Sequence, residues 1–305
     1  MAAGQTRVAH NGLKMEVSER FEKFLSNITL TEAQLKDGAT KRESVCGVLN
    51  AKYFNSNSGT ANSFYVGSLG KATRTRPPRD VDVLFSLPSD VYHRFDRLAG
   101  NKQSQLLQEI RSALRSSFPN TDIRGDGPVV LVPFATYAVE LLPAFKLQNG
   151  QYWIPITANA GFYKNFDSDA ELKNIKVSND KTNNNTRDLV RMMKCWQSFC
   201  SVPLKSFYLE LLAVNFLNQW GYAGRSKVYY DWMARDYFAY IIGQANNFLF
   251  VPGTHETLSL GDTWKSRAQT AHDRAVKAVK YEADKMPYHA GEDWQKIFGT
   301  DIPLA

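Results

Sequence analysis

The chain has 305 residues, of which 43 % are hydrophobic and 22 % are charged. This composition excludes a disordered or fibrous protein, and the length predicts about two domains. Lysine and arginine number 37 against 30 aspartates and glutamates, so the net charge is +7, which favours an anionic partner such as a nucleotide or nucleic acid.

The chain shows no signs of a membrane or secreted protein. No apolar run approaches the ~18 residues of a membrane span, and the N-terminal segment has no secretory signal. The three cysteines, Cys46, Cys195 and Cys200, cannot all pair with one another, so we expect a cytoplasmic protein. None of the five histidines lies at zinc-ligand spacing, and we expect no zinc.

In the first half, predicted helices and strands alternate. Residues 13–50 are predicted to be helical, with a restart at Thr31, where Gln34 stands at the capping-box position. A short strand over 63–66 ends at Gly67. The elements that follow are a strand over 80–85, a helix over 101–118 and strands over 129–132 and 137–142.

From about residue 160 the pattern becomes helical. Four helices are predicted there, over 187–199, 204–220, 231–242 and 263–285. We therefore expect an α+β protein with two lobes. Residues 1–165 would form a mixed α/β lobe that includes the N-terminal helix and a small twisted sheet, and residues 166–305 a helical lobe.

Two aspartates on the strand over 80–85 indicate a cation site. Asp80 and Asp82 are two residues apart, so both side chains point to the same face of the strand. Paired carboxylates that face one way repel each other, and Mg²⁺ uses such pairs together with substrate phosphates. The alternative is a solvent-facing edge of an amphipathic strand.

The surrounding residues favour the functional interpretation. Gly67 and Ser68 follow a strand, and glycine allows backbone amides to approach a phosphate closely. The loop after them contains no acidic residue and four basic ones, which suits a triphosphate; these are Lys71, Arg74, Arg76 and Arg79. Glu140 is the lone carboxylate of an otherwise apolar strand and would supply the third acidic group that two-metal phosphoryl transfer needs.

Gly67-Ser68, Asp80-x-Asp82 and Glu140 together resemble the pattern of the DNA polymerase β-like nucleotidyltransferase superfamily. The helical segments 187–196 and 204–212 are similar to the branch that contains oligoadenylate synthase and cyclic GMP-AMP synthase. Residues 63–75 and 139–145 resemble the bacterial members, the cGAS/DncV-like nucleotidyltransferases or CD-NTases. The resemblance extends from about residue 13 to 300.

This resemblance implies a two-lobed enzyme with its active site in the cleft between the lobes. Such enzymes make cyclic di- or trinucleotide second messengers from nucleoside triphosphates, ATP among them, and act in anti-phage (CBASS-type) signalling. The implied cofactor is Mg²⁺, with Mn²⁺ able to substitute. Some relatives have a regulatory or conjugating protein partner, whereas no nucleic-acid activator is indicated here.

The family's residue roles transfer by position. Gly67 and Ser68 would hold the donor triphosphate, and Asp80, Asp82 and Glu140 would be the catalytic, metal-binding carboxylates. The substrate-binding residues of the helical lobe would be Lys194 and Ser206 on phosphates and Phe207 on the donor base. Many relatives carry aspartate where Glu140 stands.

Other functions share part of this pattern. A template-independent nucleotidyltransferase that makes linear oligonucleotides or extends RNA would use the same three carboxylates. A nucleotide-binding sensor would have lost one of them, and a minimal nucleotidyltransferase that modifies protein or tRNA is usually much shorter.

Overall fold

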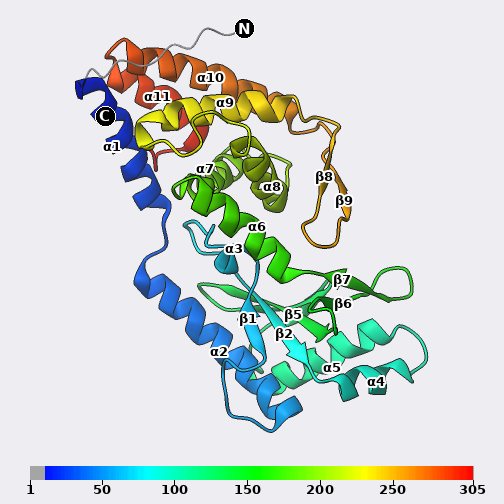
Figure 1. Ribbon diagram of the computed structural model, residues 1–305. Coiled ribbons are helices and arrows are strands. Elements are labelled where there is room, and N and C mark those ends of the chain that lie inside the picture. The colour runs from blue at the N-terminus through cyan, green and yellow to red at the C-terminus, as the bar shows by residue number, and fades with distance from the viewer. Residues whose placement is uncertain (1–10, 305) are drawn as a thin grey trace. The chain divides into compact units, whose positions relative to one another are not determined.

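The computed structural model describes residues 11–304, and its fold is the predicted α+β arrangement of a sheet with helical regions (Figure 1). Within the described chain the residues divide into two compact units. The sheet unit contains Leu30–Asn174 and Val251–Glu256, and the helical unit contains the residues up to Thr29, Ile175–Phe250 and the residues from Thr257 on.

The sheet unit is built on one mixed sheet. Its central pair is parallel and consists of β2 (Asp80–Leu87) and β5 (Ala138–Lys146). All the other strand pairs described are antiparallel, in the order β1-β2-β5-β4-β3, with β6 on the far end of β5 and β7 beside β6. These strands are β1 (Ser63–Tyr65), β3 (Arg124–Asp126), β4 (Val129–Pro133), β6 (Tyr152–Ile156) and β7 (Phe162–Phe166).

The two faces of the central strands differ because side chains alternate along a strand. One face buries Val81, Val83, Val139 and Leu141 in the main core of the unit. The helices that contribute to this core are α2 (Glu32–Phe54), α4 (Ser89–Asp96) and α5 (Lys102–Ser117). The opposite face carries a smaller apolar cluster, to which Leu84, Leu142 and Ala144 belong; the carboxylates described below share that face.

The N-terminal helical segment is broken where the sequence predicted. Helix α1 (Asn11–Ile28) ends before α2, and Thr31 caps α2 through a capping box with Gln34. The side chains of Val17, Phe21 and Phe24 are buried in the core of the helical unit. The predicted lobe of residues 1–165 therefore differs from the observed sheet unit, because the apolar face of α1 packs with the helical core.

The helical unit surrounds a core rich in tryptophan. Trp196, Trp264 and Trp294 are fully buried in it. Its helices are the second half of α6 (Ser168–Lys181), α7 (Asn185–Phe199), α8 (Ser206–Leu217), α9 (Tyr230–Ile242) with the short η1 (Lys227–Tyr229), α10 (Lys265–Ala283) and α11 (Pro287–Phe298). The sequence predicted α7–α10 but neither α11 nor the hairpin of β8 (Phe248–Phe250) and β9 (Thr257–Ser259).

The loop of that hairpin belongs to the sheet unit. Glu256 forms an ion pair with Lys164 at 2.6 Å, and Gly253 lies so close to Asp167 that a Cβ there would collide with its carboxylate. In the described range, no helix is both long enough and apolar enough to cross a membrane.

Candidate active site

The three predicted carboxylates lie together on the sheet unit. Strands β2 and β5 are parallel, and their register places Asp82 directly beside Glu140. Asp80 is two residues before Asp82 and therefore shares its face. The sheet thus brings the side chains that the sequence predicted as catalytic onto one face of two adjacent strands.

Burial explains why an acidic residue occurs inside an apolar strand. Val139 and Leu141, the neighbours of Glu140, point to the opposite face and are fully buried there. Glu140 and Asp82 are half-buried, and Asp80 is exposed. Burial of the apolar side chains therefore sets which face of β5 packs on the core, and Glu140 points to the other face.

A short glycine turn supports Asp82. Helix α3 (Gly67–Gly70) is a single turn, and Gly67 adopts a φ of +52°, which favours glycine. A Cβ at Gly67 would collide with the Asp82 carboxylate, so no larger residue fits. The backbone N–H of Ser68 donates to Oδ2 of Asp82 at 3.3 Å. The predicted Gly-Ser turn and the acidic pair are therefore parts of one site.

The negative charges of the site perturb one another. Burial, reinforced by Asp82 and then Asp80, raises the pKa of Glu140 from 4.5 to about 7. Asp126 on β3 and a side-chain hydrogen bond with Asp82 act in the same direction. Although the Asp80 side chain is exposed, partial desolvation by the surrounding chain raises the pKa of its carboxyl, against a smaller lowering effect of Arg79. Without a cation, Glu140 is thus held partly protonated near neutral pH.

This carboxyl should make the stability of the cation-free protein depend on pH. The pKa of Glu140 in the folded protein is above its unfolded value. The stabilisation that comes from its protonated carboxyl is therefore complete below about pH 4.5 and is lost as the pH rises through about 7. In EDTA, the melting temperature of the wild type should fall by about 2–4 °C relative to Glu140→Gln over that window, as a solvent-screened effect of roughly 1 kcal/mol would give. If the melting temperatures of the two proteins changed with pH by the same amount, the result would contradict the raised pKa of Glu140.

The donor set fits a hard divalent cation. Carboxylate oxygens are the ligands that Mg²⁺ prefers, and this ion is commonly held by one or two carboxylates together with substrate phosphates. Across residues 11–304, no three His, Cys, Asp or Glu side chains form a ready-made metal cage. The mutual repulsion at Glu140 is the feature that a cation would relieve.

The four basic side chains of the loop after the turn differ in their exposure to solvent. Arg76 and Arg79 are exposed and Arg74 is half-buried. Lys71, the fourth basic residue of the loop, is buried, and its ammonium lies 2.8 Å from the carboxylate of Glu171. No pattern within the loop indicates this pair, because Glu171 stands a hundred residues further along the chain.

The remaining predicted residues lie in the helical unit, on α7 and α8. Lys194 forms an ion pair with Glu210 at 2.7 Å, and the Ser206 hydroxyl is hydrogen-bonded to Oε1 of Gln197 at 2.7 Å. Phe207 is half-buried against the helical core. These two helices pack together, so the three residues belong to one part of the unit.

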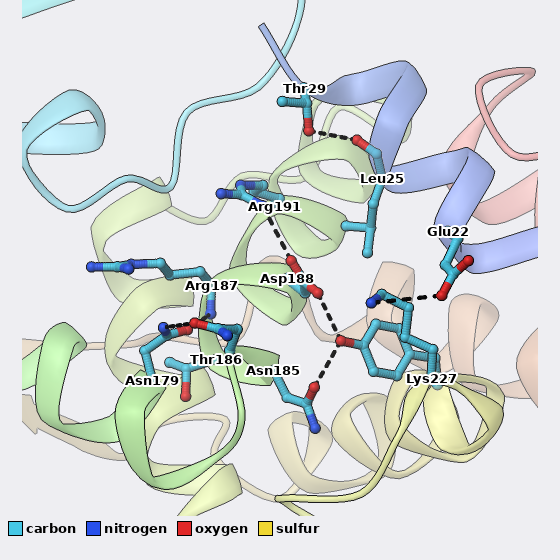
Figure 2. A network of polar contacts seen from close by, with 12 residues as sticks. Glu22, Leu25, Thr29, Asn179, Asn185, Thr186, Arg187, Asp188, Arg191 and Lys227 are labelled. Atoms are coloured by element: carbon cyan, nitrogen blue, oxygen red, sulfur yellow. Dashed lines mark hydrogen bonds and ion pairs between the residues drawn. The ribbon is translucent and has the colours of Figure 1, made fainter. Parts of the chain in front are cut away.

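The start of α7 carries two further basic side chains that the sequence reasoning did not name, Arg187 and Arg191 (Figure 2). Arg191 forms an ion pair with Asp188 at 3.1 Å, and the hydroxyl of Tyr230 donates to Asp188 at 2.7 Å. Arg187, Arg191 and Lys194 are spaced by four and three residues, which places them on one face of the helix. That spacing is the signal that would have found them.

Comparison with known proteins identifies the class. Residues 15–179, more than half of the chain, match the Second Messenger Oligonucleotide or Dinucleotide Synthetase domain, and the chain belongs to that family. It is a bacterial nucleotidyltransferase of the CD-NTase type, as the sequence indicated.

Individual relatives agree with this assignment. A probable cyclic nucleotide synthase of Bacillus cereus (strain VD146) is 21 % identical over 274 residues, which cover 78 % of this chain and 81 % of the relative. The structure of CdnC from E. coli MS115-1 in complex with HORMA-deltaN has a TM-score of 0.70 at 18 % identity, covering 94 % of this chain and 98 % of CdnC. DncV cyclic AMP-GMP synthase from Vibrio cholerae, in complex with a linear intermediate, has a TM-score of 0.65 at 12 % identity, covering 95 % of this chain and 88 % of DncV. These two structures show a shared fold.

Proposed function

We propose that this enzyme joins nucleoside triphosphates into a cyclic di- or trinucleotide and releases pyrophosphate. The observation that carries the proposal is the set of Asp80, Asp82 and Glu140 on one face of β2 and β5, beside the Gly67-Ser68 turn. Two divalent cations, Mg²⁺ by preference, would be held by these carboxylates. When bound, they would neutralise charge on the phosphate and lower the pKa of the attacking hydroxyl.

The turn is suited to hold the donor triphosphate. Its glycine lets the backbone approach an anion closely, and the Ser68 hydroxyl can donate to a phosphate oxygen. From the family resemblance we assign Lys194 and Ser206 to phosphate contacts and Phe207 to stacking on the donor base. The half-buried Phe207 ring and the firmly held Lys194 ammonium are compatible with these roles.

The chemistry is an in-line substitution at the α-phosphorus of the donor. A 2′- or 3′-hydroxyl of the acceptor forms the new P–O bond, the bond to pyrophosphate breaks, and the hydroxyl proton leaves to base. Glu140, beside Asp82 on the adjacent strand, would hold the cation that activates that hydroxyl. A second such step between the ends of the linear product closes the ring.

We further propose an anti-phage signalling role under the control of a protein regulator. The resemblance to the CD-NTases supports this role, and the E. coli relative was solved with a HORMA protein. Loss of phage resistance on replacing the wild-type gene with an Asp82→Asn gene in its native host would support it. Unchanged resistance would contradict it.

Replacing Phe207 with alanine should weaken donor binding. Loss of one aromatic stacking platform should lower nucleoside triphosphate affinity about tenfold, since stacking of a base on an aromatic ring contributes roughly 1–3 kcal/mol. Titration of a non-hydrolysable triphosphate by calorimetry measures the effect. Phe199→Ala is the matched control, because that ring is exposed in the same unit. Equal affinities of the two variants would assign Phe207 to the core alone.

A product assay tests the proposed function directly. Purified protein is incubated with all four ribonucleoside triphosphates and Mg²⁺ or Mn²⁺, then with phosphatase, and the resistant species are identified by mass spectrometry. A phosphatase-resistant di- or trinucleotide is the expected result and reveals the bases and ring size. Linear, phosphatase-sensitive oligomers alone would instead assign the enzyme to template-independent polymerisation.

A further inference from the structure

The Gly67-Ser68 turn is closed by backbone hydrogen bonds from Lys71 and Thr73. The N–H of Lys71 donates to the carbonyl of Gly67 at 3.1 Å, and the N–H of Thr73 donates to the carbonyl of Ser68 at 2.9 Å. The position of Lys71 and the course of the backbone at Gly67-Ser68 are therefore linked. A displacement of Lys71 would move the Ser68 amide that bonds to Asp82.

The side chain of Lys71 points away from solvent, toward the start of α6. Its ammonium lies 2.8 Å from Oε2 of Glu171, and the two side chains are only 5 % and 12 % exposed. Removing two charges from water is costly, so such a pair is weak evidence for stability but fixes geometry when both partners are present. The pair ties the end of the turn to one helix.

The helix end that carries Glu171 is itself fixed. Oδ1 of Asp167 accepts the N–H of Ala170 at 2.8 Å, and the carbonyl of Asp167 accepts the N–H of Glu171 at 3.2 Å. Gly70 packs against the same helix, since a Cβ there would lie 3.2 Å from Cδ2 of Leu172. The start of α6 is thus a rigid support directly behind the turn.

We propose that Glu171 is a positioning residue for the donor triphosphate, acting through Lys71 on the Gly67-Ser68 turn. This inference rests on the proposed function, because it assigns the turn to triphosphate binding. Lys71 does not contact the phosphates in this arrangement. It holds the backbone that does, and Glu171 holds Lys71.

Binding measurements on Glu171→Gln and Lys71→Met test the proposal, with Asp169→Asn as the control on the exposed side of the same helix. The probes are a non-hydrolysable ATP analogue and AMP, each with Mg²⁺. Both variants should bind the triphosphate about tenfold more weakly, roughly the loss of one hydrogen bond to a charged group, and AMP within about twofold of wild type. A merely structural role would weaken both ligands alike.

The double variant Lys71→Met/Glu171→Gln distinguishes indirect from direct action. If Glu171 acts through Lys71, the double variant should lose no more triphosphate affinity than Lys71→Met alone. If the losses of triphosphate affinity multiplied in the double variant, Lys71 would act as a direct phosphate ligand and the proposal would be overturned. A loss of affinity in Lys71→Met with none in Glu171→Gln would lead to the same conclusion. Glu171→Asp, which keeps the charge, replaces Glu171→Gln if that variant fails to fold.

Amide hydrogen exchange separates this inference from the proposed function. In ligand-free protein, the amides of residues 68–73 should exchange faster in Glu171→Gln than in wild type or Asp169→Asn. That result would show that Glu171 holds the Gly67-Ser68 turn even if wild-type protein bound no triphosphate, an outcome that would contradict the proposed function. Unchanged exchange in this segment would overturn the positioning role itself.

Discussion

Asp82→Asn should abolish nucleotidyl transfer while leaving the protein folded. The amide keeps an oxygen that can accept the Ser68 N–H, so the turn should survive. It removes the negative charge at the centre of the carboxylate set, beside Glu140. We expect a fall in turnover of at least about 10³-fold, equivalent to ~4 kcal/mol of barrier, measured as pyrophosphate release.

The same substitution should leave the cation-free protein as stable as the wild type or more so. Asp82 raises the pKa of Glu140, and removing its charge relieves that repulsion. Asp90→Asn is the control, because Asp90 is exposed in the first turn of α4 and should retain wild-type turnover. Turnover of Asp82→Asn within about tenfold of wild type would contradict the metal assignment.

The largest loss of stability is expected for Arg20→Met. Arg20 is buried in the helical unit, where its guanidinium lies 2.9 Å from Glu282 and donates to the carbonyls of Pro287, Pro303 and Leu304. Removing it leaves a buried carboxylate and three carbonyl groups that have lost their donor. The free energy of unfolding should fall by about 3–5 kcal/mol, the usual cost of breaking a buried ion pair.

Tryptophan fluorescence during urea unfolding measures this loss of stability in the helical unit. Of the six tryptophans only Trp153 lies in the sheet unit, so the signal reports mainly on the helical unit. Lys23→Met, an exposed cation on the same helix, should change the midpoint little. The Arg20→Met loss should be smaller at low pH, where Glu282, whose pKa burial already raises, becomes protonated. Equal midpoints for the two variants would contradict the role of Arg20.

Local signals in the sequence predicted much of the site. The alternation of Asp80, Val81 and Asp82 sets which side chains share a face whatever the strand pairs with. The capping box at Thr31 needs only residues three apart, and it forms as predicted. Glu140 stood out as the lone carboxylate of an apolar strand, and the family resemblance then joined it to Asp82.

Contacts between residues far apart in the chain could not be predicted from local sequence patterns. The register that puts Asp82 beside Glu140 joins strands 58 residues apart, and no periodicity specifies it. Lys71 was grouped with the other basic side chains of its loop because Glu171, its partner, lies on another element. Strands β6 and β7 were not predicted, since neither segment alternates apolar and polar residues.

The division of the chain has a consequence for the order of folding during synthesis. Most of the sheet unit is one continuous stretch, Leu30–Asn174, and can begin to fold as soon as it leaves the ribosome. Phe21 and Phe24 emerge earlier, yet Phe24 packs against Phe298 and Phe21 against Trp294. The apolar face of α1 must therefore wait for almost the entire chain, and we expect nascent chains of this enzyme to need a chaperone at that helix until the last turns of α11 are made.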